Sequence, residues 1–339
     1  MSRPEQRSAS RWTRREALTA AGGIGVAGLA GCLGGGSNAD SLTVFHAGSL
    51  APPFERLAAQ FEDDHGVEVS REAKGSVYST RKVTEQGRRA DVLGVSDYRL
   101  LRDMLLPDYG SWYVVFQTNA MTVLYREDAP GADEIGTDNW WEVLSRDGVR
   151  VGHSDPAVDP GGYRSVMAMR LGAVPFRGEA LYDEATRDAM VANSVVPTGT
   201  ETKLVGQLES GKLDYAFNYR SVATTADLPS VTLQPQVDLS KMTADYAEHY
   251  ASVTVETDSG NYRGAPIAYG MAVPDVAQSP DLGAAWVATA LGETGRAISE
   301  ETGFVPLETP VVPASAADAV PERVLEYATA KDSVGPLGL

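Results

Sequence analysis

The chain has 339 residues, 43% hydrophobic and 22% charged, so it can form one or two substantial cores and is neither disordered nor collagenous. Its formal net charge is −17; because residues 1–31 carry five arginines against two glutamates, the remainder carries −20. This charge excludes nucleic acid and anionic lipid head groups as favoured partners. Cys32 is the only cysteine, which excludes a disulfide within the chain.

The acidic surplus, with only six lysines among 29 basic residues, resembles that of proteins adapted to high salt, where repulsion is screened. Simple solubility is the alternative explanation. A site for anions would have to work through local N–H donors, since the overall field repels anions.

The N-terminus has the features of a targeting segment. Residues 13–18 (TRREAL) resemble a twin-arginine export signal, and the apolar run 17–30 is too short for a comfortable transmembrane helix. Residues 29–32 (LAGC) resemble the lipobox that precedes a lipid-modified cysteine. We therefore predict a signal over 1–31, then a lipidated Cys32 with a Gly/Ser tether over 32–40. An uncleaved anchor with an incidental Cys32 is the alternative.

Three strand-loop-helix units open the predicted folded body, with strands at 42–45, 67–69 and 91–95. Repeated units of this kind favour a parallel sheet flanked by helices. In such sheets ligands lie beyond the carboxyl ends of the strands. The loops that end in Gly48-Ser49 and Gly75-Ser76 lie at those ends.

An extended run at 117–125 predicts a crossover into a second lobe. There, a strand at 149–152 leads into a loop and then a helix, whose apolar face begins at Tyr163. Asp159 and Pro160 stand in the order typical of an N-cap and a first helical residue. A helix N-terminus with free N–H donors is a ready anion site, although capping alone is the commoner role of such an aspartate.

The remaining elements return the chain to the first lobe. We predict a helix that ends at Gly211, a strand at 213–217 that ends at Asn218, and a return crossover at 264–273. A single helix over 282–298 and an irregular, proline-rich tail follow.

Several motifs resemble those of the tungstate/molybdate-binding proteins of ABC uptake systems. They are residues 45–50 (FHAGSL), 81–85 (RKVTE), 91–93 (DVL), 159–165 (DPGGYRS) and 214–217 (DYAF), in the family's order from about residue 42 to the C-terminus. The resemblance implies an α/β, two-lobed type II periplasmic-binding fold in which each lobe is a mostly parallel sheet flanked by helices. Lobe 1 would be 41–116 plus 274–339, and lobe 2 would be 117–273.

The resemblance also implies function. The protein would be a monomeric, membrane-anchored lipoprotein outside the cell membrane, without cofactor or catalysis, that captures molybdate or tungstate between its lobes and delivers it to an ABC permease. Gly48, Ser49, Gly75 and Ser76 would donate hydrogen bonds to the oxyanion, and Asp159 would approach the metal. Asn218 stands where better-known members carry a glutamate, which puts six-oxygen coordination in doubt.

Each candidate also has a plain structural interpretation. Ser49 and Ser76 would cap helices, and His46 would be a buried histidine bonded to backbone. Gly162 and Tyr163 are weaker ligand candidates, and Tyr163 would otherwise be a core contact. We expect Arg164 and Arg220 to pair with acids on the surface, or less readily to frame the cleft mouth.

Three other functions stay open at this stage. A sulfate- or phosphate-binding protein of the same fold is the first, although Asp159 disfavours doubly charged sulfate. A hydrolase that uses Ser49 and His46 lacks a G-x-S-x-G segment. A polymer-binding surface lipoprotein would expose an aromatic face, whereas the aromatics here have core spacing.

Overall fold

The structure of the protein is a computed structural model that describes residues 41–197 and 200–339. The predicted signal, Cys32 and the tether lie outside the described residues. The described residues belong to one compact unit. Among them, no helix combines the length and the apolar character needed to cross a membrane.

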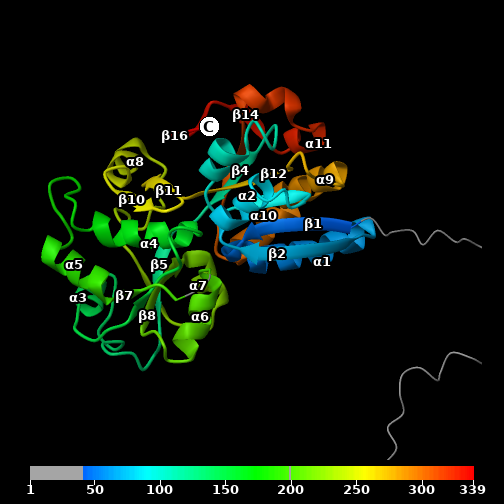
Figure 1. The fold of residues 1–339 in the computed structure, drawn as a ribbon. Coiled ribbons are helices and arrows are strands. Elements are labelled where there is room, and N and C mark those ends of the chain that lie inside the picture. Colours follow the sequence, from blue (N-terminus) through cyan, green and yellow to red (C-terminus); the bar gives the residue numbers. More distant parts are fainter. Residues whose placement is uncertain (1–40, 198–199) are drawn as a thin grey trace, which may run out of the picture. The chain divides into compact units, whose positions relative to one another are not determined.

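The larger sheet has seven strands and joins segments from both ends of the sequence, coloured blue to cyan and orange to red in Figure 1. In spatial order they are β14 (Thr329–Lys331), β13 (Val305–Pro313), β4 (Val114–Thr118), β12 (Ala268–Ala272), β3 (Val92–Val95), β1 (Ser41–Ala47) and β2 (Glu68–Lys74). The strands β2, β1 and β3 are parallel, as the repeated strand-loop-helix units predict. The strand β12 runs antiparallel to both of its neighbours, so the sheet is mixed.

The second sheet has five strands from the middle of the chain. In spatial order they are β7 (Ser194–Val195), β6 (Val151–Gly152), β8 (Tyr215–Tyr219), β5 (Met121–Tyr125) and β9 (Ser230–Thr232). The strand β6 is parallel to β7 and β8, whereas β5 is antiparallel to β8 and β9. Two small hairpins complete the strands, namely β10 (Thr254–Thr257) with β11 (Gly260–Arg263), and β15 (Ser333–Val334) with β16 (Leu337–Gly338).

Helices accompany both sheets. Those that follow or pack on the larger sheet are η1 (Gly48–Leu50), α1 (Ala51–His65), α2 (Ser76–Thr84), η2 (Leu101–Leu105), α9 (Pro280–Leu291), α10 (Glu293–Glu301), η3 (Ala314–Ala319) and α11 (Glu322–Leu325). Those of the middle segment are α3 (Trp140–Leu144), α4 (Pro160–Leu171), α5 (Glu184–Asn193), α6 (Thr202–Glu209), α7 (Arg220–Thr225) and α8 (Ala244–Tyr250).

The strand β1 shows why the larger sheet is buried on both faces. Successive side chains of a strand point to opposite faces. Leu42 and Val44 join the core that contains Phe54 of α1, while Phe45 joins a second core with Val83 of α2. Both faces of this near-continuous apolar strand are therefore buried, which holds β1 and the loop after it in place.

The chain changes sheet within the predicted crossover at 117–125. This run is two strands, β4 and β5, in different sheets, and Asn119 and Ala120 join them. The Asn119 side chain accepts hydrogen bonds from the Ala120 and Ser221 N–H groups and donates to the Ser221 hydroxyl. The division into lobes and the hinges stay predictions.

Three predictions about the later elements are wrong. The strand β8 extends two residues further than 217, so Asn218 lies inside it. The predicted helix 282–298 is two helices, because Gly292 is extended and ends α9 before α10 begins. The tail is not irregular: β13 pairs with β4, and its register shifts between Pro306 and Val311, where prolines cannot donate to a continuous ladder.

Candidate functional site

The loops after β1 and β2 meet where the sequence places them, at the carboxyl ends of two adjacent parallel strands. Ser49 and Ser76 are both buried there. Neither hydroxyl caps its helix, contrary to the plain structural interpretation. The Ser49 hydroxyl lies 2.9 Å from the Tyr269 hydroxyl, and the Ser76 hydroxyl accepts the Ser96 N–H at 3.0 Å.

Asp159 caps α4, as its position before Pro160 predicts, and is completely buried. One carboxylate oxygen accepts the Gly161 N–H and the other accepts the Glu201 N–H, each at 3.2 Å. Each oxygen therefore keeps capacity for a further interaction.

Gly75 lets the loop after β2 pack against the Asp159 side chain. A Cβ atom at Gly75 would lie 3.0 Å from the Asp159 Cβ and would overlap the Val158 carbonyl oxygen. That same carbonyl accepts the Tyr78 N–H at 3.2 Å, in the first turn of α2. A glycine is thus required for the two loops to touch.

Glu201 is the principal residue that the sequence analysis missed. It stands just before α6, is 1% exposed, and accepts the Ser49 N–H on Oε1 at 2.7 Å. A Cβ atom at Gly48 would lie 3.0 Å from Oε2, so the carboxyl group packs directly on the Gly48 backbone. Acidic residues are common at the start of helices, where they interact favourably with the helix dipole. The sequence around Glu201 therefore gives no sign that this glutamate belongs to a site.

Burial and the neighbouring Asp159 charge raise the pKa of Glu201 well above its usual value. Two carboxyl groups that meet away from water resist joint ionisation. The site therefore holds a pair of acids, one more than the sequence analysis expects.

Asn218 holds the Glu201 backbone in place. Its Nδ2 donates to the Glu201 carbonyl oxygen at 3.0 Å, and its Oδ1 accepts the Tyr219 N–H at 2.8 Å. A carboxylate at position 218 could not make the first of these bonds, because it has no donor. The amide is therefore engaged with protein groups.

Gly162 and Tyr163 serve packing in this structure. A Cβ atom at Gly162 would lie 2.6 Å from the Pro156 nitrogen and would overlap the Ser154 carbonyl oxygen. The Tyr163 hydroxyl donates to Asp97 at 2.7 Å, and its ring stacks on Tyr262 with centroids 4.2 Å apart.

Arg164 corrects a second expectation, since it is buried rather than paired at the surface. Its Nη1 donates to the Ser96 carbonyl oxygen at 2.7 Å and to the Tyr219 hydroxyl at 2.8 Å. Arg164 and Arg99 outweigh the effect of burial and hold the pKa of Asp97 well below its usual range. Arg220 is exposed and donates to the Gly303 carbonyl oxygen at 3.1 Å.

Two buried polar atoms near Asp159 have no hydrogen-bond partner, the Ser154 hydroxyl and Glu201 Oε2. A Cβ atom at Gly161 would lie 3.1 Å from the Ser154 Oγ and 3.3 Å from Asp159 Oδ2. Buried polar groups are usually satisfied, so an unpartnered hydroxyl beside the Asp159 carboxylate marks a place for a polar ligand.

The other candidates for chemistry lie apart from this cluster. His46 has its Nδ1 2.8 Å from the Ala47 carbonyl oxygen and its ring against Phe54, the structural role that we predict. Among the described residues, no three His, Cys, Asp or Glu side chains could hold a metal ion.

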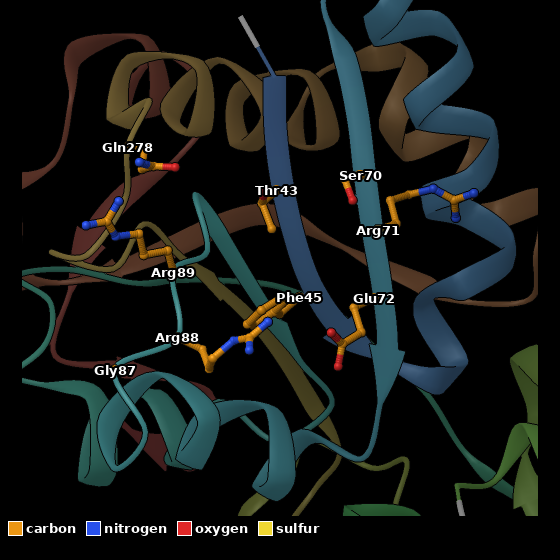
Figure 2. Close-up of a pocket in the computed structure, with 9 residues that line it drawn as sticks. All are labelled: Thr43, Phe45, Ser70, Arg71, Glu72, Gly87, Arg88, Arg89 and Gln278. Carbon is orange, nitrogen blue, oxygen red and sulfur yellow. The ribbon is translucent and has the colours of Figure 1, made fainter. Parts of the chain in front are cut away.

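A separate pocket of about 630 Å³ lies at the C-terminal end of α2, whereas Ser76 begins that helix. Arg71, Arg88 and Arg89 line it, and Figure 2 shows Arg88 extending toward Phe45 of β1 and Arg89 turned toward Gln278. Its one acid, Glu72, is paired with Lys82 at 2.6 Å.

Known proteins resemble this chain over most of its length. The sequence profile described as "Bacterial extracellular solute-binding protein" matches residues 42–305. An "Uncharacterized solute-binding protein" of Methanoculleus marisnigri is 40% identical, over 84% of this chain and 85% of its own. The "Molybdate/tungstate-binding protein WtpA" of Pyrococcus abyssi is 35% identical, over 89% of this chain and 97% of its own.

Solved structures confirm the predicted fold class. The periplasmic molybdate-binding protein of Azotobacter vinelandii superposes with a TM-score of 0.58 at 18% identity, over 78% of this chain and 98% of its own. The sulfate-binding protein SubI of Mycobacterium tuberculosis gives a TM-score of 0.57 at 17% identity, over 83% of this chain and 91% of its own. The relatives and the fold are those of binding proteins rather than enzymes, and the chain belongs to the extracellular solute-binding protein family.

Proposed function

We propose that the protein binds molybdate or tungstate between the loops after β1 and β2 of the larger sheet and the loop before α4 of the second sheet. The observation that carries this proposal is the buried carboxylate of Asp159, held at a helix N-terminus against the glycine-rich loops of the other sheet. The name of the Pyrococcus abyssi relative supports the choice of ligand.

A buried carboxylate suits these two anions better than sulfate. Two unit charges roughly 4 Å apart repel by about 4 kcal/mol at an effective dielectric of about 20. Molybdenum and tungsten have empty d orbitals and can accept a further oxygen ligand, which offsets the repulsion. Sulfur in sulfate does not do so readily. Asp159 would therefore attract one class of oxyanion and reject the other.

Hydrogen-bond donors would hold the oxygens. The backbone N–H groups of Gly48, Ser49, Gly75 and Ser76 would be these donors, since fixed donors in a dry site bind anions well. Gly75 lies against Asp159, and Gly48 and Ser49 lie against Glu201. The unpartnered Ser154 hydroxyl adds a donor that the sequence analysis did not consider. Asn218 would act indirectly, through the Glu201 backbone. Gly162 and Tyr163 would shape the loop without touching the ligand.

The wider setting follows from the sequence motifs and the family. The protein would be exported, lipidated at Cys32 and held outside the cell membrane. It would close its lobes over the anion by hinges near 117–125 and 264–273, then deliver the anion to an ABC permease as a monomer.

Replacement of Asp159 by asparagine tests the proposal. The N-cap survives, since asparagine caps as well as aspartate, so the fold should persist. Loss of the anionic oxygen ligand to the metal should weaken tungstate binding at least tenfold, measured by isothermal titration calorimetry. Asp183→Asn is the matched control, because Asp183 caps α5 in the same way and is exposed. Equal affinities in both variants would leave Asp159 a plain N-cap.

A further inference from the structure

Glu201 has a position that the proposed site does not explain. Its carboxyl group is buried, accepts the Ser49 N–H on Oε1, and leaves Oε2 without a partner. A structural glutamate would be expected to satisfy both oxygens or to reach water. Glu201 does neither.

The bonded N–H is one that an oxyanion in the site would need. A carboxyl oxygen and an oxyanion oxygen both accept a hydrogen bond from a backbone N–H group. The Ser49 N–H is a single donor, so it cannot make a full-strength bond to both acceptors. Glu201 and the ligand therefore compete for Ser49.

The same hydrogen bond bridges the two sheets. Ser49 follows β1 of the larger sheet, and Glu201 precedes α6, which packs on β8 of the second sheet. A ligand between Asp159 and Ser49 would bridge the same pair of elements. The Glu201 carboxyl group thus makes, within the chain, a contact of the kind that the ligand would make.

The backbone of Glu201 is held by hydrogen bonds that do not involve its own side chain. The Glu201 N–H donates to Asp159, and the Glu201 carbonyl oxygen accepts from Asn218. Rotation about the side-chain bonds alone would release Ser49. The absence of a side chain at Gly48 leaves the carboxyl group room against the backbone.

We propose that Glu201 is an internal surrogate ligand, which occupies the Ser49 N–H in the empty site and is displaced by the incoming oxyanion. The identity of that oxyanion rests on the proposed function. An anion that also bonds to Asp159 gains enough to displace Glu201, whereas one held by hydrogen bonds alone does not. Glu201 thereby lowers the affinity for every anion but excludes those that hydrogen bonds alone would hold. Its effect is to increase selectivity.

Glu201→Gln and Glu201→Ala in the full chain test this role. Glutamine keeps the shape and an acceptor oxygen, whereas alanine removes the acceptor. By calorimetry, tungstate should bind about tenfold tighter to the alanine variant than to the wild type, sulfate binding should become detectable there, and the affinity of the glutamine variant should lie between the two. Glu209→Gln, at the exposed end of α6, changes a glutamate away from the site and should change nothing.

Weaker tungstate binding to both variants would overturn the proposal, because Glu201 would then be a ligand of the bound anion. Affinities equal to that of Glu209→Gln would also overturn it and leave Glu201 a structural residue. Thermal unfolding of each variant checks that it is folded.

The amide resonance of Ser49 gives a second readout that needs no ligand. In the empty wild-type protein it should show the downfield shift of an N–H bonded to a carboxyl oxygen, and Glu201→Ala should remove that shift. An unchanged resonance would contradict the surrogate role. If the resonance changes but wild type binds neither tungstate nor molybdate, the proposed function fails while the Glu201 contact stands.

Discussion

Two acidic side chains without a cation at their own contact make the centre of the site unusual. Asp159 accepts one backbone N–H on each carboxylate oxygen, whereas Glu201 leaves one oxygen unpartnered. The buried cation Arg164 donates to the Ser96 carbonyl oxygen and the Tyr219 hydroxyl rather than to either acid. Unpaired buried acids lower stability and persist mainly where function requires them.

His46 allows a prediction about stability and pH. Burial lowers its pKa to about 4 from the usual 6.5. The unfolded chain therefore takes up a proton below pH 6.5, while the folded chain does so only near pH 4. The stabilisation that neutral His46 provides is complete above pH 6.5 and is lost as the pH falls toward 4, by up to about 3 kcal/mol.

The measurement compares wild type with His46→Asn in urea at pH 7.5 and at pH 4.5. The difference in unfolding free energy between the two proteins should shrink by about 2 to 3 kcal/mol at the lower pH. Other titrating groups cancel in this comparison. A difference that does not depend on pH would mean that His46 titrates normally.

Sequence reasoning finds Asp159 but not Glu201 for a physical reason. Asp159 belongs to a local pattern, an N-cap before proline and two glycines, which is visible within a few residues. The role of Glu201 depends on Ser49, 152 positions away in the sequence, and nothing near Glu201 records that contact. The burial of Arg164 likewise depends on Ser96, 68 positions away.

The start of α4 is the element that positions the site. Its first turn carries the Asp159 cap, and Gly162 lets it lie against the loop at Ser154 to Pro156. Strand-loop-helix signals of this kind are local, so the sequence predicts both the helix and its cap. The order of strands is set by distant pairing, and so the β13–β4 pair and the placement of β12 could not be predicted from local patterns.

Gly162→Ala tests how tightly α4 is seated. The new methyl group would overlap the Ser154 carbonyl oxygen, so the loop must shift, at a cost of about 1 to 3 kcal/mol in unfolding free energy. Gly206→Ala in α6 is the matched control, because a Cβ there meets no atom within 4 Å. That variant should instead be more stable by up to about 1 kcal/mol. Chemical denaturation of both variants measures the contrast, and equal effects would argue against close packing at Gly162.

At the scale of the whole molecule, the described residues place two sheets so that their loops meet at one set of acids and donors. Asn119 links the point of crossing to the site, since its Nδ2 lies 3.3 Å from the Tyr269 hydroxyl, which contacts Ser49. Two contacts therefore connect the point where the chain changes sheet with the Ser49 hydroxyl.

The net charge of −17 opposes the binding of any dianion at long range. At an ionic strength of 1 M the screening length is about 3 Å, so only groups in contact with the anion matter there. Selectivity should consequently survive high salt, because it depends on Asp159, Glu201 and the local donors rather than on the field of the molecule.

Calorimetric titration of the purified protein with tungstate, molybdate, sulfate and phosphate, each at high salt, tests the central claim most directly. We expect tungstate and molybdate to bind at one site per chain, and sulfate and phosphate to give no heat of binding. Tight binding of sulfate or phosphate, or binding of none of the four anions, would contradict the proposed role of the Asp159 site.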